Sequence, residues 1–166
     1  FSGVTVFDPG FSPPDLRLVV GDVIDLRGTL TEFPGPASGP FSFCQSLPEI
    51  SGTVSLRFDG EDGAAAPVGI AQLTTYSAAR EWFGVLVRLQ NVTIATDPES
   101  SSGRYSAAIQ VPGGSTEQPT ITNELFDLEL EGPPLAQGTV LSSITGIVTY
   151  FYGVHIAPRS AADIVP

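Results

Sequence analysis

Few side chains in this sequence could carry acid–base or nucleophilic chemistry. The chain has one histidine, His155, and one cysteine, Cys44. A serine–histidine–aspartate triad would have to use His155, and the sequence has no Gly-x-Ser-x-Gly elbow, phosphate-binding loop or metalloprotease helix. A single histidine also excludes histidine-rich metal centres. We therefore interpret His155 as a strand residue and predict no catalytic residues and no enzymatic activity.

Carboxylates form two local groups. The first is a turn with two glycines, in which the oxygens of Asp59, Glu61 and Asp62 could bind calcium. Its spacing lacks the EF-hand pattern and the closing glutamate, so a solvated turn is the favoured reading, and we expect no other cofactor. The second group alternates with apolar residues, as on the outward face of a strand: Asp127, Glu129 and Glu131.

Aromatic rings and arginines are the best binding candidates. Rings that stack on bases or sugars beside a cationic groove hold single-stranded nucleic acid or glycans. The candidate ligand face consists of Phe33, Trp82, Arg88, Tyr150 and Tyr152. The alternative is that these rings fill the protein core. The chain has no lysine and a formal net charge of −11, which disfavours nucleic-acid binding, so we expect self-association or another surface protein as the partner.

The composition indicates a β protein. The chain has 166 residues, 42% of them hydrophobic, with 15 Pro and 18 Gly, which suits one domain of short strands and tight turns. No apolar run approaches the roughly 18 residues of a membrane span. Cys44 stands next to Phe43 and cannot form an intrachain disulfide, so we expect a buried, inert thiol.

A glycine pattern occurs twice. Gly21 and Gly28 stand in one β-branched, alternating run, and Gly138 and Gly146 stand in another. A glycine inside such a run marks a place where a Cβ would clash and the strand bends. The two runs therefore predict bent strands of a small β-barrel.

The remaining pattern predicts short strands and little helix. Apolar alternation favours strands at residues 4–7, 16–33, 41–48, 53–58, 81–94, 104–111, 123–131 and 139–156. Helical spacing occurs once, within residues 67–80, and residues 157–166 are expected to be a loop.

Three segments carry a family resemblance. They are the run from Val20 to Phe33, the run from Trp82 to Thr93, and the run from Ile144 to Ile164. Together they resemble the OB-fold domains of secreted bacterial nucleases and related cell-surface proteins. The resemblance implies an all-β, OB-fold-like Greek-key barrel over residues 16–166, with extra strands and at most one short helix. It also implies a secreted, extracellular or cell-surface location and no nuclease machinery, which lies in a separate domain of the larger proteins.

Residues 1–15 are expected to form an N-terminal arm. In the resembling domains another strand precedes the one that matches Val4, Thr5, Val6 and Phe7, and an unpaired sheet edge accepts a strand from a neighbour. This predicts a structural or assembly role, as a filament or surface-layer subunit joined by N-terminal strand addition. The alternative is a nucleic-acid- or glycan-binding accessory domain of a secreted nuclease.

Overall fold

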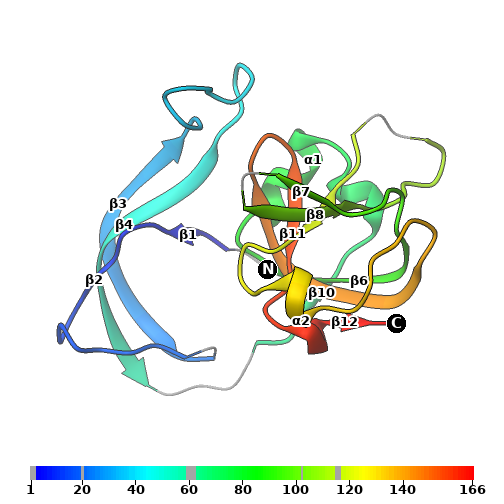
Figure 1. Cartoon of the computed structure of the whole chain (residues 1–166). Helices are drawn as coiled ribbons and strands as arrows, with labels where there is room; N and C mark the ends of the chain where they lie inside the picture. The colour runs from blue at the N-terminus through cyan, green and yellow to red at the C-terminus, as the bar shows by residue number, and fades with distance from the viewer. Residues whose placement is uncertain (1–2, 20, 59–62, 102, 115–116) are drawn as a thin grey trace. The chain divides into compact units, whose positions relative to one another are not determined.

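The computed structural model describes residues 3–19, 21–58, 63–101, 103–114 and 117–166. These residues form mainly strands in two sheets, with short helices, which confirms the all-β class (Figure 1). The chain divides into two compact units. We call Val4–Ala64 the ribbon unit, and Phe1–Gly3 together with Ala65–Pro166 the core unit. The strands expected separately at residues 41–48 and 53–58 are one continuous strand, Leu47–Phe58. The division differs from the expected arm and barrel, because this strand pairs with residues 23–33 and also with residues 5–6 and 10–11 of the arm.

The ribbon unit consists of two long antiparallel strands and the N-terminal arm (Figure 1). Strand β3 (Val23–Phe33) pairs with β4 (Leu47–Phe58) along almost its whole length. The arm adds β1 (Thr5–Val6) and β2 (Gly10–Phe11), both parallel to β4 on its other edge. Strand β4 is therefore the central strand of this sheet.

The two faces of this sheet differ in polarity, because β3 and β4 alternate with period two. One face carries aliphatic and aromatic residues in register: Val6, Phe11, Ile24, Leu26, Leu30, Ile50, Val54 and Leu56. The other carries Asp25, Arg27, Thr29, Thr31, Glu49, Ser51, Thr53 and Ser55. Such a pattern is typical of a sheet with one covered face and one solvated face. The pattern reverses at one end of the ladder, where Glu32 and Pro48 share the apolar face and Phe33 and Leu47 share the polar one.

Gly28 stands directly opposite Gly52 in this sheet. A Cβ added to Gly28 would lie 1.9 Å from the Ser51 carbonyl oxygen, so the two backbones approach too closely for any side chain. The clash that the sequence predicts at Gly28 is confirmed, and β3 continues through this position as one strand.

The core unit contains the larger sheet, in which the strands follow the order β5-β6-β10-β11-β9-β8-β7, with β12 also on β10. The long strands are β6 (Leu86–Thr93) and β10 (Val140–Tyr150). The short ones are β5 (Ala66–Pro67), β7 (Glu99–Ser101), β8 (Arg104–Ala108), β9 (Thr120–Thr122), β11 (Val154–Ala157) and β12 (Ile164–Val165). The fully buried aliphatic core includes Leu73, Leu89, Ile94, Ile109, Ile121, Leu128, Leu135, Leu141, Ile144 and Ile156.

The sheet of the core unit curls, but the described strands do not close into a barrel. The segments that follow β6 and β8 meet through an isolated bridge between Ile94 and Ile109. The expected closed Greek-key barrel is therefore corrected to a curled, open sheet, which ends at the short strands β5 and β7. A single bridge, and not a ladder, joins the segments that follow β6 and β8.

Helices are short and more numerous than expected. The segment predicted to be helical contains the 3-10 helix η1 (Ile70–Leu73), α1 (Tyr76–Ala79) and the 3-10 helix η2 (Arg80–Trp82). A second α-helix, α2 (Leu128–Glu131), corrects the expectation of at most one. The tail, expected to be a loop, contains the 3-10 helix η3 (Ala161–Asp163) and β12, which pairs with β10 at Ser143 and Ile144.

The strand expected at residues 123–131 is wrong, because a helix cap competes with the alternating pattern. The Asp127 side chain accepts a hydrogen bond from the Leu130 N–H at 3.1 Å and begins α2, which buries Leu128. Asp127, Glu129 and Glu131 therefore lie at and within a helical turn and do not form one side of a strand.

Replacing Asp127 with alanine tests this cap. The loss of the side-chain acceptor is expected to lower the free energy of unfolding by about 1 kcal/mol. Urea unfolding followed by the fluorescence of Trp82, the chain's single tryptophan, measures the change within the core unit. Glu131→Ala removes an exposed carboxylate from the same turn and is the control, for which no loss is expected.

Cys44 is exposed, which corrects the expectation of a buried thiol. It lies in the connection between β3 and β4 with a left-handed backbone, φ 64°. Its neighbour Phe43 is 97% exposed, whereas Phe41 of the same run is buried, so burial of the run stops before Cys44.

Candidate functional site

The structure does not gather the five residues of the candidate ligand face into one group. Phe33 belongs to the ribbon unit, where its ring packs edge-on against Phe41 with centroids 5.6 Å apart. The other four belong to the core unit.

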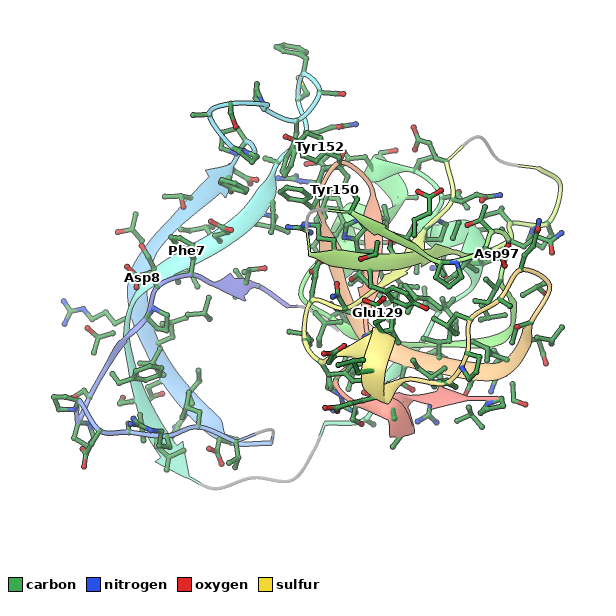
Figure 2. All side chains as sticks on the ribbon, viewed as in Figure 1. Phe7, Asp8, Asp97, Glu129, Tyr150 and Tyr152 are labelled. Atoms are coloured by element: carbon green, nitrogen blue, oxygen red, sulfur yellow. The ribbon has the colours of Figure 1, made fainter. Side chains whose placement is uncertain are left out.

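The rings of the core unit are largely packed. Tyr150 is buried, and its ring centroid lies 5.0 Å from that of Tyr76 and 5.6 Å from that of Phe83. Tyr152 is 55% exposed and packs edge-on against Phe151 at the turn between β10 and β11 (Figure 2). Tyr150 therefore agrees with the alternative interpretation, in which the rings fill the core. The ring of Tyr152 is exposed to solvent.

Trp82 ends η2 and is partly buried. Its indole Nε1 is buried and has no hydrogen-bond partner among the described residues. The ring therefore contributes to packing beside α1 and offers little surface for stacking a ligand.

Arg88 lies at a pocket of about 610 Å³ in the core unit. The pocket is lined by three segments: residues 67–70, residues 88–93, and Ile109, Gln110 and Pro112. Pockets of roughly 300–1,000 Å³ that combine apolar walls with a few polar groups are the usual binding sites for small ligands. This pocket is the strongest candidate site in the described part of the chain.

The pocket follows from an interruption in the sheet. Strand β5 pairs with β6 only at Val87 and Arg88, and the Val68 N–H donates to the Arg88 carbonyl at 3.1 Å. Pairing on this edge resumes where the Gln110 N–H donates to the Thr93 carbonyl at 2.8 Å. Within the described residues, no strand pairs with this edge of β6 between those two points.

A polar network that sequence analysis missed lies on the other side of β10. Glu124 Oε1 lies 2.7 Å from His155 Nδ1, and Glu124 Oε2 accepts a hydrogen bond from Thr149 Oγ1 at 2.7 Å. Arg104 completes the network, 3.5 Å from Glu124 and with its guanidinium 3.8 Å from the centroid of the Phe151 ring. His155 was read correctly as a strand residue, in β11, but sequence spacing gave no signal for its partner.

These contacts change the acidity of Glu124. Burial alone would raise its pKa, but the hydrogen bonds from His155 and Thr149 and the charges of His155 and Arg104 outweigh burial and lower the pKa. The network ties β8, β10 and β11 to the loop after β9. Because both Glu124 oxygens and His155 Nδ1 are engaged in these contacts, the arrangement is a structural clasp.

A second clasp closes the C-terminal end of the core unit. Arg159 donates to Asp163 through its backbone N–H, Nε and Nη2, each at 2.9 Å. Burial would raise the pKa of Asp163, but these hydrogen bonds and the charge of Arg159 lower it, and Arg88 adds a smaller effect in the same direction. The carboxylate of Asp163 is therefore already occupied.

The calcium candidate Asp59, Glu61 and Asp62 lies outside the described residues. Within the described ranges, no group of three metal-ligating side chains forms. None of the helices described here has the length and apolar character that a membrane span requires.

Three of the four residues of the predicted assembly arm, Thr5, Val6 and Phe7, pair with β4. The Thr5 and Val6 positions pair with Glu49 and Ile50, and the Phe7 N–H donates to the Ile50 carbonyl at 2.9 Å. Phe7 and Asp8 continue this arm (Figure 2), and Asp8 has a left-handed backbone, φ 45°, which ends the pairing of β1. The arm is therefore held by two separate strands of two residues each.

Comparison with models of protein families, with curated proteins and with solved structures finds no match for this chain.

Proposed function

We propose that this chain is a non-catalytic extracellular module with a structural role, whose copies join through the N-terminal arm as subunits of a filament or surface layer. The observation that carries the proposal is the ribbon unit, a four-stranded sheet with one face rich in apolar residues. A small sheet needs three or more strands with such a hydrophobic face, or packing against a helix, to be stable.

The ribbon unit buries few of its own apolar side chains. Among its described residues, the buried ones are Phe41, Leu47 and Val54. Its exposed large apolar residues are Val4, Phe7, Phe11, Leu18, Val19, Leu30, Phe43 and Leu56. A concentration of exposed apolar side chains of this kind marks an interaction surface.

The arm supports a second copy of the chain as the partner that binds to the edge of β4. Its short strands hold the edge of β4 with few hydrogen bonds, and Phe7 remains 60% exposed. An edge strand held so loosely can be exchanged for the same strand of another molecule, because the pairing partner is identical in every copy. Exchange of arms from copy to copy would produce an open chain of subunits.

The core unit supports an OB-fold-like barrel of the partly open kind. Its curled sheet brings the segments after β6 and β8 together at Ile94 and Ile109, and OB folds are partly open barrels. The resemblance to domains of secreted nucleases and cell-surface proteins is the reason for proposing an extracellular location. No observation favours the nucleic-acid- or glycan-binding alternative, because its rings are divided between two units and Tyr150 is buried.

Cysteine pairing between two different variants tests arm exchange directly. Val6 and Ile50 are register partners, close enough in a parallel ladder for a disulfide. One variant carries Val6→Cys and the other Ile50→Cys, each with Cys44→Ser. On mixing and mild oxidation, we expect more disulfide-linked dimer on a non-reducing gel from the mixture than from either variant oxidised alone, since only the mixture can join position 6 to position 50. The control pairs Val6→Cys with Leu30→Cys, and a yield no higher than this control would refute exchange.

The arm's backbone hydrogen bond provides the second test. Phe7→Pro removes the N–H that donates to Ile50, whereas Phe7→Ala keeps it. In sedimentation velocity over a concentration series, we expect the proline variant to need at least about tenfold more protein than the alanine variant to reach the same degree of association. A monomeric wild type at every concentration would overturn the assembly proposal.

A further inference from the structure

The unpaired edge of β6 has the dimensions of a strand-binding site. The gap lies between the hydrogen bond that joins Val68 to Arg88 and the one that joins Gln110 to Thr93. It leaves residues 89–92 without a neighbouring strand on that side in the described structure. At roughly 3.3 Å per residue the gap is about 13 Å long, the length of about four extended residues. Asn91 within it has a left-handed backbone, φ 54°, which interrupts the regular strand edge.

The pocket beside this edge offers contacts for side chains as well as for a backbone. Apolar walls come from Val68, Ile70 and Ile109, and the amides of Gln90 and Gln110 lie among the lining residues. An extended peptide added to a sheet edge gains affinity from main-chain hydrogen bonds and specificity from pockets for alternate side chains.

Arg88 supplies the charge. Among the residues that line the pocket, all of them described, it is the one with a charged side chain. Its Nε donates to the hydroxyl of buried Thr145, the register partner of Arg88 on β10, at 3.0 Å, so contact of the guanidinium with a ligand at the open edge requires this hydrogen bond to be exchanged. The nearby Asp163 is held by Arg159, so it does not neutralise Arg88 by a direct ion pair.

We propose that this edge binds an extended peptide segment with one acidic side chain. The peptide backbone pairs with residues 89–92 of β6, and the carboxylate contacts Arg88. A segment with a single carboxylate is favoured over a polyanion, because the whole chain carries a net charge of −11 and repels highly negative ligands at a distance. This site lies wholly in the core unit and does not depend on arm exchange.

Titration of ¹⁵N-labelled protein with four probes tests the site. The first is a blocked pentapeptide, acetyl-Thr-Val-Asp-Val-Thr-amide, and the second replaces its aspartate with asparagine. The third is the aspartate peptide with its central amides N-methylated, and the fourth is sodium acetate. We expect the aspartate peptide to shift the amide signals of residues 68–70, 88–93 and 110. We also expect it to bind at least about tenfold more tightly than the asparagine and N-methylated peptides.

Two variants locate the binding. Arg88→Gln should abolish the preference for aspartate over asparagine, whereas Arg57→Gln, which removes the same charge from β4 of the ribbon unit, should leave it unchanged. Should Arg88→Gln fail to give a dispersed spectrum, Gly69→Leu serves instead. A Cβ at Gly69 meets only Gln72 Oε1, at 3.7 Å, so a side chain is tolerated at this position, which lines the pocket, and the leucine should weaken binding.

Three results would each overturn the proposal. The first is the absence of shifts at β6 with every peptide. The second is equal affinity for the aspartate and N-methylated peptides, which would show that no strand pairing occurs. The third is a set of shifts that acetate reproduces in full, which would show an adventitious ion only.

Discussion

Gly146→Ala is expected to lower the free energy of unfolding of the core unit by about 3 kcal/mol. A Cβ at this position would lie 2.7 Å from Ile156 Cγ2 and 2.9 Å from the carbonyl carbon of Ala157. Ile156 is fully buried and Ala157 belongs to the paired strand β11, so neither atom can move without opening the sheet. Urea unfolding followed by Trp82 fluorescence measures the loss.

Gly153→Ala is the matched control for this prediction. Gly153 lies in the turn that joins β10 to β11, has no atom within 4 Å of an added Cβ and does not have a left-handed backbone. Its replacement should change stability by no more than about 0.5 kcal/mol. Equal stabilities of the two variants would contradict the close packing of β10 on β11.

Glu124→Gln is expected to lower the free energy of unfolding by about 2 kcal/mol at neutral pH. The substitution removes the carboxylate charge that contacts His155, Thr149 and Arg104. The glutamate side chain is 23% exposed and His155 13%, so solvent screens these contacts only in part. Glu99→Gln, an exposed carboxylate on β7 of the same unit, is the control and should have almost no effect.

The cost of Glu124→Gln should depend on pH in a defined direction. Burial would raise the folded-state pKa of Glu124 above its ordinary value of 4.5. Its hydrogen bonds and the neighbouring charges outweigh burial and lower this pKa. A carboxylate whose pKa is lower in the folded than in the unfolded state stabilises the fold at pH values above its unfolded-state pKa. This stabilisation is lost as the pH falls through its folded-state pKa. The stability difference between wild type and variant should therefore shrink as the pH falls below about 4.5. A difference that grows below that pH would refute the assignment.

The largest differences between expectation and structure concern contacts between distant residues. Arg88 and Thr145 are 57 positions apart, and Glu124 and His155 are 31 apart, so no local pattern connects them. The pocket likewise exists because β5 ends at Pro67 and the next contact with that edge of β6 comes from Gln110. Sequence analysis placed Arg88 in a ligand face, but it grouped Arg88 with rings that the structure places elsewhere.

Local competition explains the errors in the elements. Residues 126–131 alternate like a strand, yet the Asp127 cap lets the same residues form one helical turn that also buries Leu128. Cys44 has an aromatic neighbour, but a left-handed turn places it in solvent. In both cases the pattern allowed two conformations, and the surrounding contacts selected one.

What the sequence determined by itself is the β class, the alternating pattern of β3, and the two positions, Gly28 and Gly146, where no side chain fits. These features follow from period-two alternation and from the absence of a Cβ, which are properties of short stretches of chain. Only the tertiary structure decided the division into a ribbon unit and a core unit, the Glu124 clasp and the open edge of β6. Each of these depends on which strands pair across long separations, and the sum of many packing contacts sets that choice.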